Sequence, residues 1–127
     1  MKKLALISSF IVAMAAPALA DPAEGIWKTQ VDDGAYAHIK MTTCGAKLCG
    51  KIARTFNDSG EYKSKNIGKP LVWDMVPAGG GSYSDGSIWQ PSKDKVYKSK
   101  MTLNGNKLLV AGCWGPICKK YTWSRVK

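Results

Sequence analysis

Gly25-Ile26-Trp27 and Trp123-Ser124-Arg125, near the two ends of the chain, decide the expected fold. A Gly-x-Trp motif on a first strand, matched by an arginine on a last strand, predicts a sheet whose ends meet, and therefore a small closed β-barrel. Because a buried guanidinium is costly unless its donors are satisfied, we expect Arg125 to stack on Trp27 and to donate to nearby carbonyls. Gly25, Trp27, Trp123 and Arg125 are thus assigned to barrel closure.

Turn signals divide the rest of the chain into short runs rich in β-branched and aromatic residues. Asn, Asp, Ser and Gly cluster at residues 32–34, 57–60, 79–82, 84–86 and 104–106, where they favour tight turns. No segment shows a sustained 3.6-residue apolar period, so an all-β antiparallel barrel of about eight strands is expected. The strands are expected at residues 24–31, 36–43, 48–56, 70–76, 86–90, 94–103, 106–113 and 118–126. Residues 57–69 are expected to form the longest loop.

Alternation along the expected strands separates an inner from an outer face. Trp27, Val31, Trp123 and Arg125 fall on inner faces. Five lysines fall on outer faces: Lys28, Lys40, Lys98, Lys100 and Lys120. Residues 106–113 do not alternate, so their facing stays open. An eight-stranded barrel either fills its interior with side chains or holds one small ligand.

The first twenty residues are typical of a secretory signal peptide. A basic Met1-Lys2-Lys3 precedes an apolar stretch over residues 4–16, and Ala18-Leu19-Ala20 forms a small-x-small cleavage site. The alternative, an uncleaved anchor, is disfavoured because the apolar run is shorter than the roughly 20 residues that a span needs. We expect cleavage after Ala20, one domain over residues 21–127, and a periplasmic or secreted protein of a Gram-negative envelope, not an integral membrane protein.

The expected mature chain is basic. Without Lys2 and Lys3, seventeen of the nineteen basic residues remain against nine acidic ones, a net charge of +8. This balance favours anionic partners such as lipid headgroups, lipopolysaccharide, cell-wall polymers or acidic proteins. Nucleic acid is not expected as a partner, because the chain leaves the cytoplasm.

Four cysteines occur as two pairs with equal spacing, Cys44 with Cys49 and Cys113 with Cys118. In an exported protein an even count indicates disulfides, and four cysteines allow three connectivities. We favour the two local bridges, each closing a four-residue turn of a hairpin. They would stabilise the fold by about 2 kcal/mol each, whereas a 44–113 bridge would give roughly 4 kcal/mol, so energy alone leaves cross-pairing open. A zinc site is disfavoured by the spacing, and no metal is expected.

The motifs resemble those of DUF2147, a family of small exported bacterial proteins of unknown function. The matching pieces, in the order of the family, are Gly25-Ile26-Trp27, Cys44-Gly45, Leu48-Cys49-Gly50-Lys51-Ile52, Gly86-Ser87-Ile88 with Pro91, Lys95-Val96-Tyr97, Met101-Thr102-Leu103, Leu108-Leu109-Val110 with Gly112-Cys113, and Trp123-Ser124-Arg125-Val126. The chain departs at Asp94-Lys95, where the family usually has Gly-Lys, and over residues 57–84. The resemblance implies no activity.

More distantly, the Gly-x-Trp opening and the terminal arginine resemble the calycin pattern of lipocalins and fatty-acid-binding proteins. Calycins hold small apolar ligands in a barrel cavity, and some calycin-like exported bacterial proteins inhibit proteases instead. The resemblance implies a calycin- or lipocalin-like barrel, and because a fold does not imply a function, it leaves the ligand open.

No catalytic constellation is visible in the sequence. His38, the only histidine, is expected on an outer face beside Lys40 as an exposed strand residue, without the nucleophile and carboxylate that a catalytic base needs. Asp32 and Asp33 precede Gly34 and are expected in a turn, and Asp85 and Asp94 in similar turns. We therefore expect a protein that is not an enzyme and uses no cofactor.

Two functions follow from these observations. The first is a monomeric barrel that binds a small apolar or amphipathic ligand or an anionic envelope component. The second is a protein-interaction module, an inhibitor or an envelope-stress partner, that acts through the Trp114 turn and the basic face. Trp114, Lys98 and Lys100 are the candidate binding residues. Trp114 would either contact a partner or pack as a lid over the barrel end.

Overall fold

The computed structural model describes residues 20–127, so the expected signal peptide lies outside the described residues except for Ala20. Nine strands follow one another: β1 (Gly25–Lys28), β2 (Tyr36–Cys44), β3 (Lys47–Asn57), β4 (Gly60–Tyr62), β5 (Pro70–Gly79), β6 (Ser82–Gln90), β7 (Lys95–Asn104), β8 (Lys107–Trp114) and β9 (Ile117–Arg125). Residues 20–127 contain no helix with the length and apolar character needed to cross a membrane.

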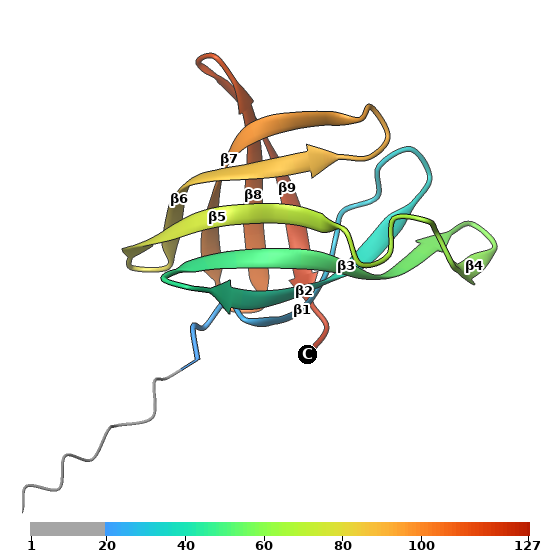
Figure 1. Ribbon diagram of the computed structural model, residues 1–127, viewed down its shortest axis with the longest axis horizontal. Coiled ribbons are helices and arrows are strands. Elements are labelled where there is room, and N and C mark those ends of the chain that lie inside the picture. Colours follow the sequence, from blue (N-terminus) through green and yellow to red (C-terminus); the bar gives the residue numbers. More distant parts are fainter. Residues whose placement is uncertain (1–19) are drawn as a thin grey trace, which may run out of the picture.

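Eight of the strands close into an antiparallel barrel (Figure 1). The sheet order is β2-β1-β9-β8-β7-β6-β5-β3-β4, and an additional pairing of β2 with β3 completes the circle. The first strand meets the last, with Trp27 opposite Arg125. The ninth strand, β4, pairs only with the end of β3 and lies to the side of the barrel. The predicted all-β barrel of about eight strands is therefore confirmed.

The structure corrects three local predictions. Residues 84–86 do not form a turn: β6 already begins at Ser82, and Asp85, with φ of 59°, lies in a bulge within the strand. The expected loop over residues 57–69 contains β4, because Asn57 and Gly60 pair in a tight hairpin. Val31 is 58% exposed, not inward, because the chain leaves the sheet after Lys28.

The interior differs between the two ends of the barrel. At the end that carries the β2–β3, β5–β6 and β7–β8 turns, which we call the closed end, side chains fill the barrel. The fully buried members of this packing are Trp27, Ile39, Met41, Leu48, Val72, Met75, Met101, Leu108 and Val110. The opposite end carries the β1–β2, β3–β5, β6–β7 and β8–β9 connections and is called the open end.

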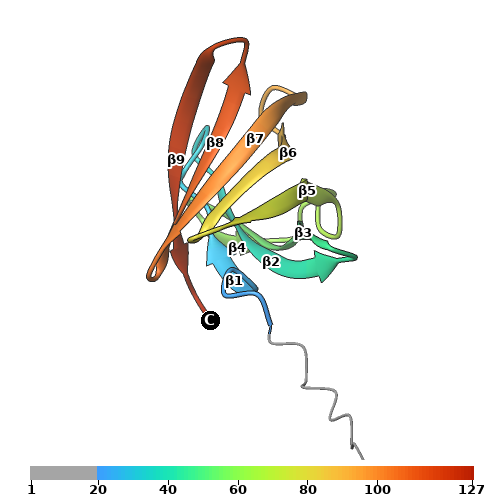
Figure 2. The same cartoon turned by 90° about the vertical axis from the view of Figure 1, so that its left-hand side faces the viewer.

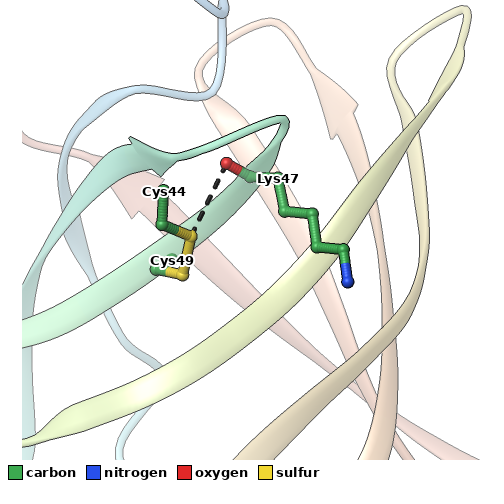
Figure 3. The surroundings of a disulfide bond; sticks show 3 residues. All are labelled: Cys44, Lys47 and Cys49. Carbon is green, nitrogen blue, oxygen red and sulfur yellow. Dashed lines mark hydrogen bonds between the residues drawn. A yellow bond between two sulfur atoms is a disulfide. The ribbon is translucent and has the colours of Figure 1, made fainter.

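The two local disulfides are present, one at each end of the barrel. Cys44–Cys49 joins β2 to β3 at the closed end, where its turn contains Lys47 (Figure 3). Cys113–Cys118 joins β8 to β9 near the open end, where this hairpin projects from the body of the barrel in both views (Figures 1 and 2). Each pair spans one hairpin, so the bridges fix two turns and do not link distant strands.

Candidate ligand-binding site

The open end of the barrel contains a cavity of about 530 Å³. Its floor is apolar and belongs to the barrel interior: Ile52 from β3, Leu71 from β5 and Trp123 from β9 are all buried and line it. All three also belong to the buried core of the barrel. The floor of the cavity is therefore the boundary of the packed interior.

Aromatic side chains form much of the wall. Those that line the cavity are Tyr36, Tyr62, Trp89, Tyr97, Trp114, Tyr121 and Trp123. Tyr97 and Trp114 contact one another with ring centroids 5.9 Å apart and planes tilted by 49°. The wall thus offers flat apolar surfaces from both sides of the mouth to a ligand.

A polar rim surrounds the mouth and is tied together by hydrogen bonds. The Asp32 carboxylate accepts hydrogen bonds from Ser92 at 2.6 Å and from Gln90 at 3.1 Å, which join the β1–β2 loop to the β6–β7 turn. Gln90 in turn accepts a hydrogen bond from the Tyr97 hydroxyl at 3.2 Å. Lys93 and Lys119 also line the cavity and bring two ammonium groups to its opening. The rim is therefore fixed in shape and mixed in charge.

Gly112 provides free space in the wall of the cavity. A Cβ atom placed on it would lie 3.6 Å from Cγ2 of Ile88 and 3.7 Å from Cβ of Tyr97, which is ordinary contact. Gly50, within the closed end, has no such room, because its Cβ would lie 2.5 Å from the sulfur of Met41. A methyl group at position 112 therefore fits, and because Gly112 lines the cavity, a longer side chain is expected to project into it.

The residues assigned to barrel closure lie together beneath the cavity. The Arg125 guanidinium stacks on Trp27 and donates hydrogen bonds to the carbonyl oxygens of Pro22 at 2.7 Å and Glu24 at 3.1 Å. The indole nitrogen of Trp27 donates to the carbonyl of Ala23 at 2.9 Å. This cluster ties the segment before β1 to the last strand, and we propose that its role is to close the barrel.

The candidate binding residues separate into two groups. Trp114 lies at the mouth of the cavity, where it touches Tyr97 and is still 52% exposed. Lys98 and Lys100 are exposed on the outside of the barrel and do not line the cavity. Alternation with the outward Lys98 and Lys120 puts Tyr97 and Tyr121 on inner faces, but the sequence does not assign them, or Trp89, to a site, because alternation gives a side chain's face and not its height along the barrel.

The sequence predicts that His38 is exposed, whereas the structure buries part of its side chain. Its ring lies 4.6 Å from that of Phe56, on the outside of β2 and β3, and it is half-buried. Burial, and next the charges of Arg54 and Lys28, lower the pKa of His38. Asp33 and Asp94 lie in turns as predicted, with φ of 52° and 49°. In the described part of the chain, no three His, Cys, Asp or Glu side chains converge to hold a metal ion.

Comparison with known proteins agrees with this architecture. The family described as "Uncharacterized protein conserved in bacteria (DUF2147)" matches residues 25–125. The chain belongs to the DUF2147 family. Among solved structures, it is similar to one described as "Protein HP1028 from the human pathogen Helicobacter pylori belongs to the lipocalin family", with a TM-score of 0.66 and 19% identity over 82% of each chain. At that identity the likeness shows the lipocalin-like fold alone. A search of curated proteins gave no match.

Proposed function

We propose that this DUF2147 protein binds a small amphipathic ligand in the open-end cavity and is not an enzyme. The carrying observation is the cavity itself: its volume of about 530 Å³ lies within the range of small-molecule sites, roughly 300–1,000 Å³. A barrel whose interior is filled by side chains would instead favour a purely structural role. The disulfides and the bacterial family are consistent with a protein that works outside the cytoplasm, and we place it in the periplasm or the extracellular space.

The lining indicates the chemical character of the ligand. Its apolar part would lie against Ile52, Leu71 and Trp123, where no polar group of the ligand could be satisfied by these side chains. Its polar part would remain at the rim, where Lys93, Lys119 and the hydroxyl and amide groups offer hydrogen bonds. Flat rings or chains would gain most from the aromatic wall.

Trp114 belongs to this proposal as a gate at the mouth. Trp114 lines the cavity and contacts Tyr97, and its exposed part is free to cover a bound ligand. This position favours a ligand site over the alternative of a protein-interaction module, for which an exposed aromatic alone would be the argument.

The cavity can be tested by filling it. Gly112→Leu places a branched side chain in the hollow half, and Gly112→Ala is the matched control because its single methyl has room. The protein would be purified in oxidised form from the compartment to which it is exported, inspected by native mass spectrometry for co-purified small molecules, and titrated with the apolar fluorophore N-phenyl-1-naphthylamine.

We expect saturable binding of the fluorophore by the wild type and by Gly112→Ala, and binding weakened at least about tenfold in Gly112→Leu, in line with the loss of a few contacts in an apolar pocket. Thermal unfolding of all three proteins controls for damage to the fold. Equal binding by a folded Gly112→Leu variant, or no saturable binding and no co-purified molecule in the wild type, would overturn the proposal.

A further inference from the structure

The last three strands carry an unbalanced positive charge. Residues 95–127 contain no Asp or Glu and eight basic residues: Lys95, Lys98, Lys100, Lys107, Lys119, Lys120, Arg125 and Lys127. Strands β7, β8 and β9 therefore form a continuous basic segment of the barrel. The one ion pair found among residues 20–127 joins Arg54 to Glu61, on β3 and β4. The lysines of β7–β9 are not neutralised by carboxylate partners of that kind.

The register places lysines together on the outside of these strands. Lys98 lies opposite Cys113, Lys100 opposite Ala111, and Ala111 opposite Lys120. Cross-strand partners share a face, so the disulfide and the lysines form one surface, which we call the outer β7–β9 face. Lys98, Lys100 and Lys120 are all exposed.

A shallow groove of about 320 Å³ crosses this face. Lys100 and Lys120 stand on either side of it, two strand spacings or about 10 Å apart, and the small side chain of Ala111 leaves the space between them open. Thr102 adds a hydroxyl group, while the Ser84 hydroxyl donates to the adjacent Asp85 carboxylate at 3.5 Å. The two ammonium groups and the Thr102 hydroxyl are donors of the kind that bind phosphate.

The tip of the β8–β9 hairpin adds apolar groups to the end of the same strands. Trp114 and Ile117 face one another across the turn and are 52% and 55% exposed. The Cys113–Cys118 bridge next to them already restrains the turn. The turn therefore loses less conformational entropy when it contacts another surface. Exposed Trp and lysines on one projecting hairpin are a combination found where proteins meet the headgroup layer of a bilayer.

We propose that the outer β7–β9 face and its hairpin tip dock on an anionic phospholipid bilayer. Phosphate headgroups would lie against Lys98, Lys100 and Lys120, and the tip would enter the headgroup layer. The face carries lysines and no arginine, and lysine acts as a mobile point charge, whereas a specific protein contact more often uses the fixed fork of arginine. These features favour a fluid array of phosphates over an acidic protein. Trp114 is shared with the mouth of the ligand cavity, but Lys98, Lys100 and Lys120 do not line the cavity, so the docking proposal does not depend on the proposed ligand.

The test uses the exported, oxidised protein and co-sedimentation with vesicles at near-physiological ionic strength. Vesicles of phosphatidylglycerol mixed with phosphatidylcholine are compared with vesicles of phosphatidylcholine alone. The variant of interest is Lys98→Gln/Lys100→Gln/Lys120→Gln. The matched control, Lys40→Gln/Lys47→Gln/Lys51→Gln, removes the same charge from β2 and β3, which lie across the barrel from β7 and β8 (Figure 2).

Each lysine near an anionic bilayer contributes roughly a fivefold factor to binding, so the β7–β9 triple variant should bind on the order of 100-fold more weakly. The control triple should lose less than about tenfold, and Trp114→Ser should lose binding without a change in charge. Gly112→Leu should bind vesicles as the wild type does, which separates docking from the cavity.

Equal losses in the two triple variants would show attraction by net charge alone and would overturn the proposal. So would equal binding to neutral and anionic vesicles. Absence of binding to either kind of vesicle would also overturn it, and capture of an acidic periplasmic protein by the wild type but not by the β7–β9 variant would then assign the surface to a protein.

Discussion

Arg125 and Trp27 pair across the seam where the last strand meets the first, with the guanidinium carbon 4.3 Å from the centre of the indole ring system. The ring is fully buried, so the cation rests on a surface that water does not reach. The same guanidinium holds the carbonyls of Pro22 and Glu24, which precede β1. One side chain of β9 therefore fixes both the first strand and the segment that leads into it.

Arg125→Ala should lower the stability of the protein more than it alters ligand binding. The change removes one cation–π contact and two charge-assisted hydrogen bonds, which together suggest about 3 kcal/mol. Urea unfolding measures the loss, and titration with N-phenyl-1-naphthylamine on the folded variant measures binding. A variant as stable as the wild type would contradict the closing role of Arg125.

Arg54→Ala is the control for that experiment. The Arg54 guanidinium donates two hydrogen bonds to the Glu61 carboxylate, at 2.5 and 2.7 Å, but both side chains are about half exposed. The hydrogen bond from Arg54 lowers the pKa of Glu61. Water screens an exposed pair of this kind, so its contribution to stability is small, and Arg54→Ala should cost clearly less than Arg125→Ala.

Glycine substitutions should distinguish the packed half of the barrel from the hollow half. Gly50→Ala would bring a methyl within 2.5 Å of the Met41 sulfur and 2.7 Å of an Ile39 methyl, in a packed core. Overpacking of this kind costs about 1–3 kcal/mol, whereas Gly112→Ala should change stability by less than about 1 kcal/mol. Thermal unfolding of the two variants checks this. Equal losses would indicate that the open half is packed as tightly as the closed half.

The sequence predicted the barrel because its turn chemistry and its alternation agree. Trp27 and Arg125 stand on strands that the pattern identified, and their spacing at opposite ends of the chain indicated closure. The sequence favours the local Cys44–Cys49 and Cys113–Cys118 bridges but leaves cross-pairing open, and the structure contains the local ones. Asp85 misled the prediction, since Asp next to Gly is typical of a turn and here the positive φ of Asp85 serves a bulge.

The cavity was beyond sequence reasoning for a physical reason. Whether an inward side chain fills the barrel or lines a hollow depends on its height and on the size of its neighbours across the axis. Tyr97 and Met101 both face inward on β7, yet Met101 is buried in the packed half and Tyr97 lines the cavity. Alternation treats the two positions alike, so only their placement in three dimensions separates them.

Cleavage after Ala20 should create a new ion pair at the closed end. The backbone nitrogen of Asp21 lies 2.9 Å from a carboxylate oxygen of Glu24, and the Asp21 side chain accepts a hydrogen bond from the Tyr83 hydroxyl at 2.6 Å. If signal peptidase frees that nitrogen as an ammonium, Glu24→Gln should destabilise the processed protein by about 1 kcal/mol.

Intact mass of the exported protein tests the position of the cut, and urea unfolding of Glu24→Gln tests the ion pair. The matched control carries one extra Ala before Asp21, which moves the ammonium away, and there Glu24→Gln should have a smaller effect. A mature chain that begins elsewhere than Asp21, or equal effects in the two backgrounds, would count against the pairing.

The stability of the protein should fall as the pH drops through the range in which His38 titrates. Burial first, and the charges of Arg54 and Lys28 next, hold the pKa of His38 below its ordinary value of 6.5. The unfolded chain therefore binds the proton more readily than the folded one, so acidification below about pH 6.5 favours unfolding, and stability is recovered as the pH rises.

Because His38 is the only histidine, NMR can follow its ring protons without ambiguity. A titration midpoint below 6.5 is expected, together with a weaker dependence of unfolding on pH between about 5 and 8 in His38→Gln. A midpoint above 6.5 would mean that the neighbouring cations and the Phe56 ring do not disfavour the charged imidazole.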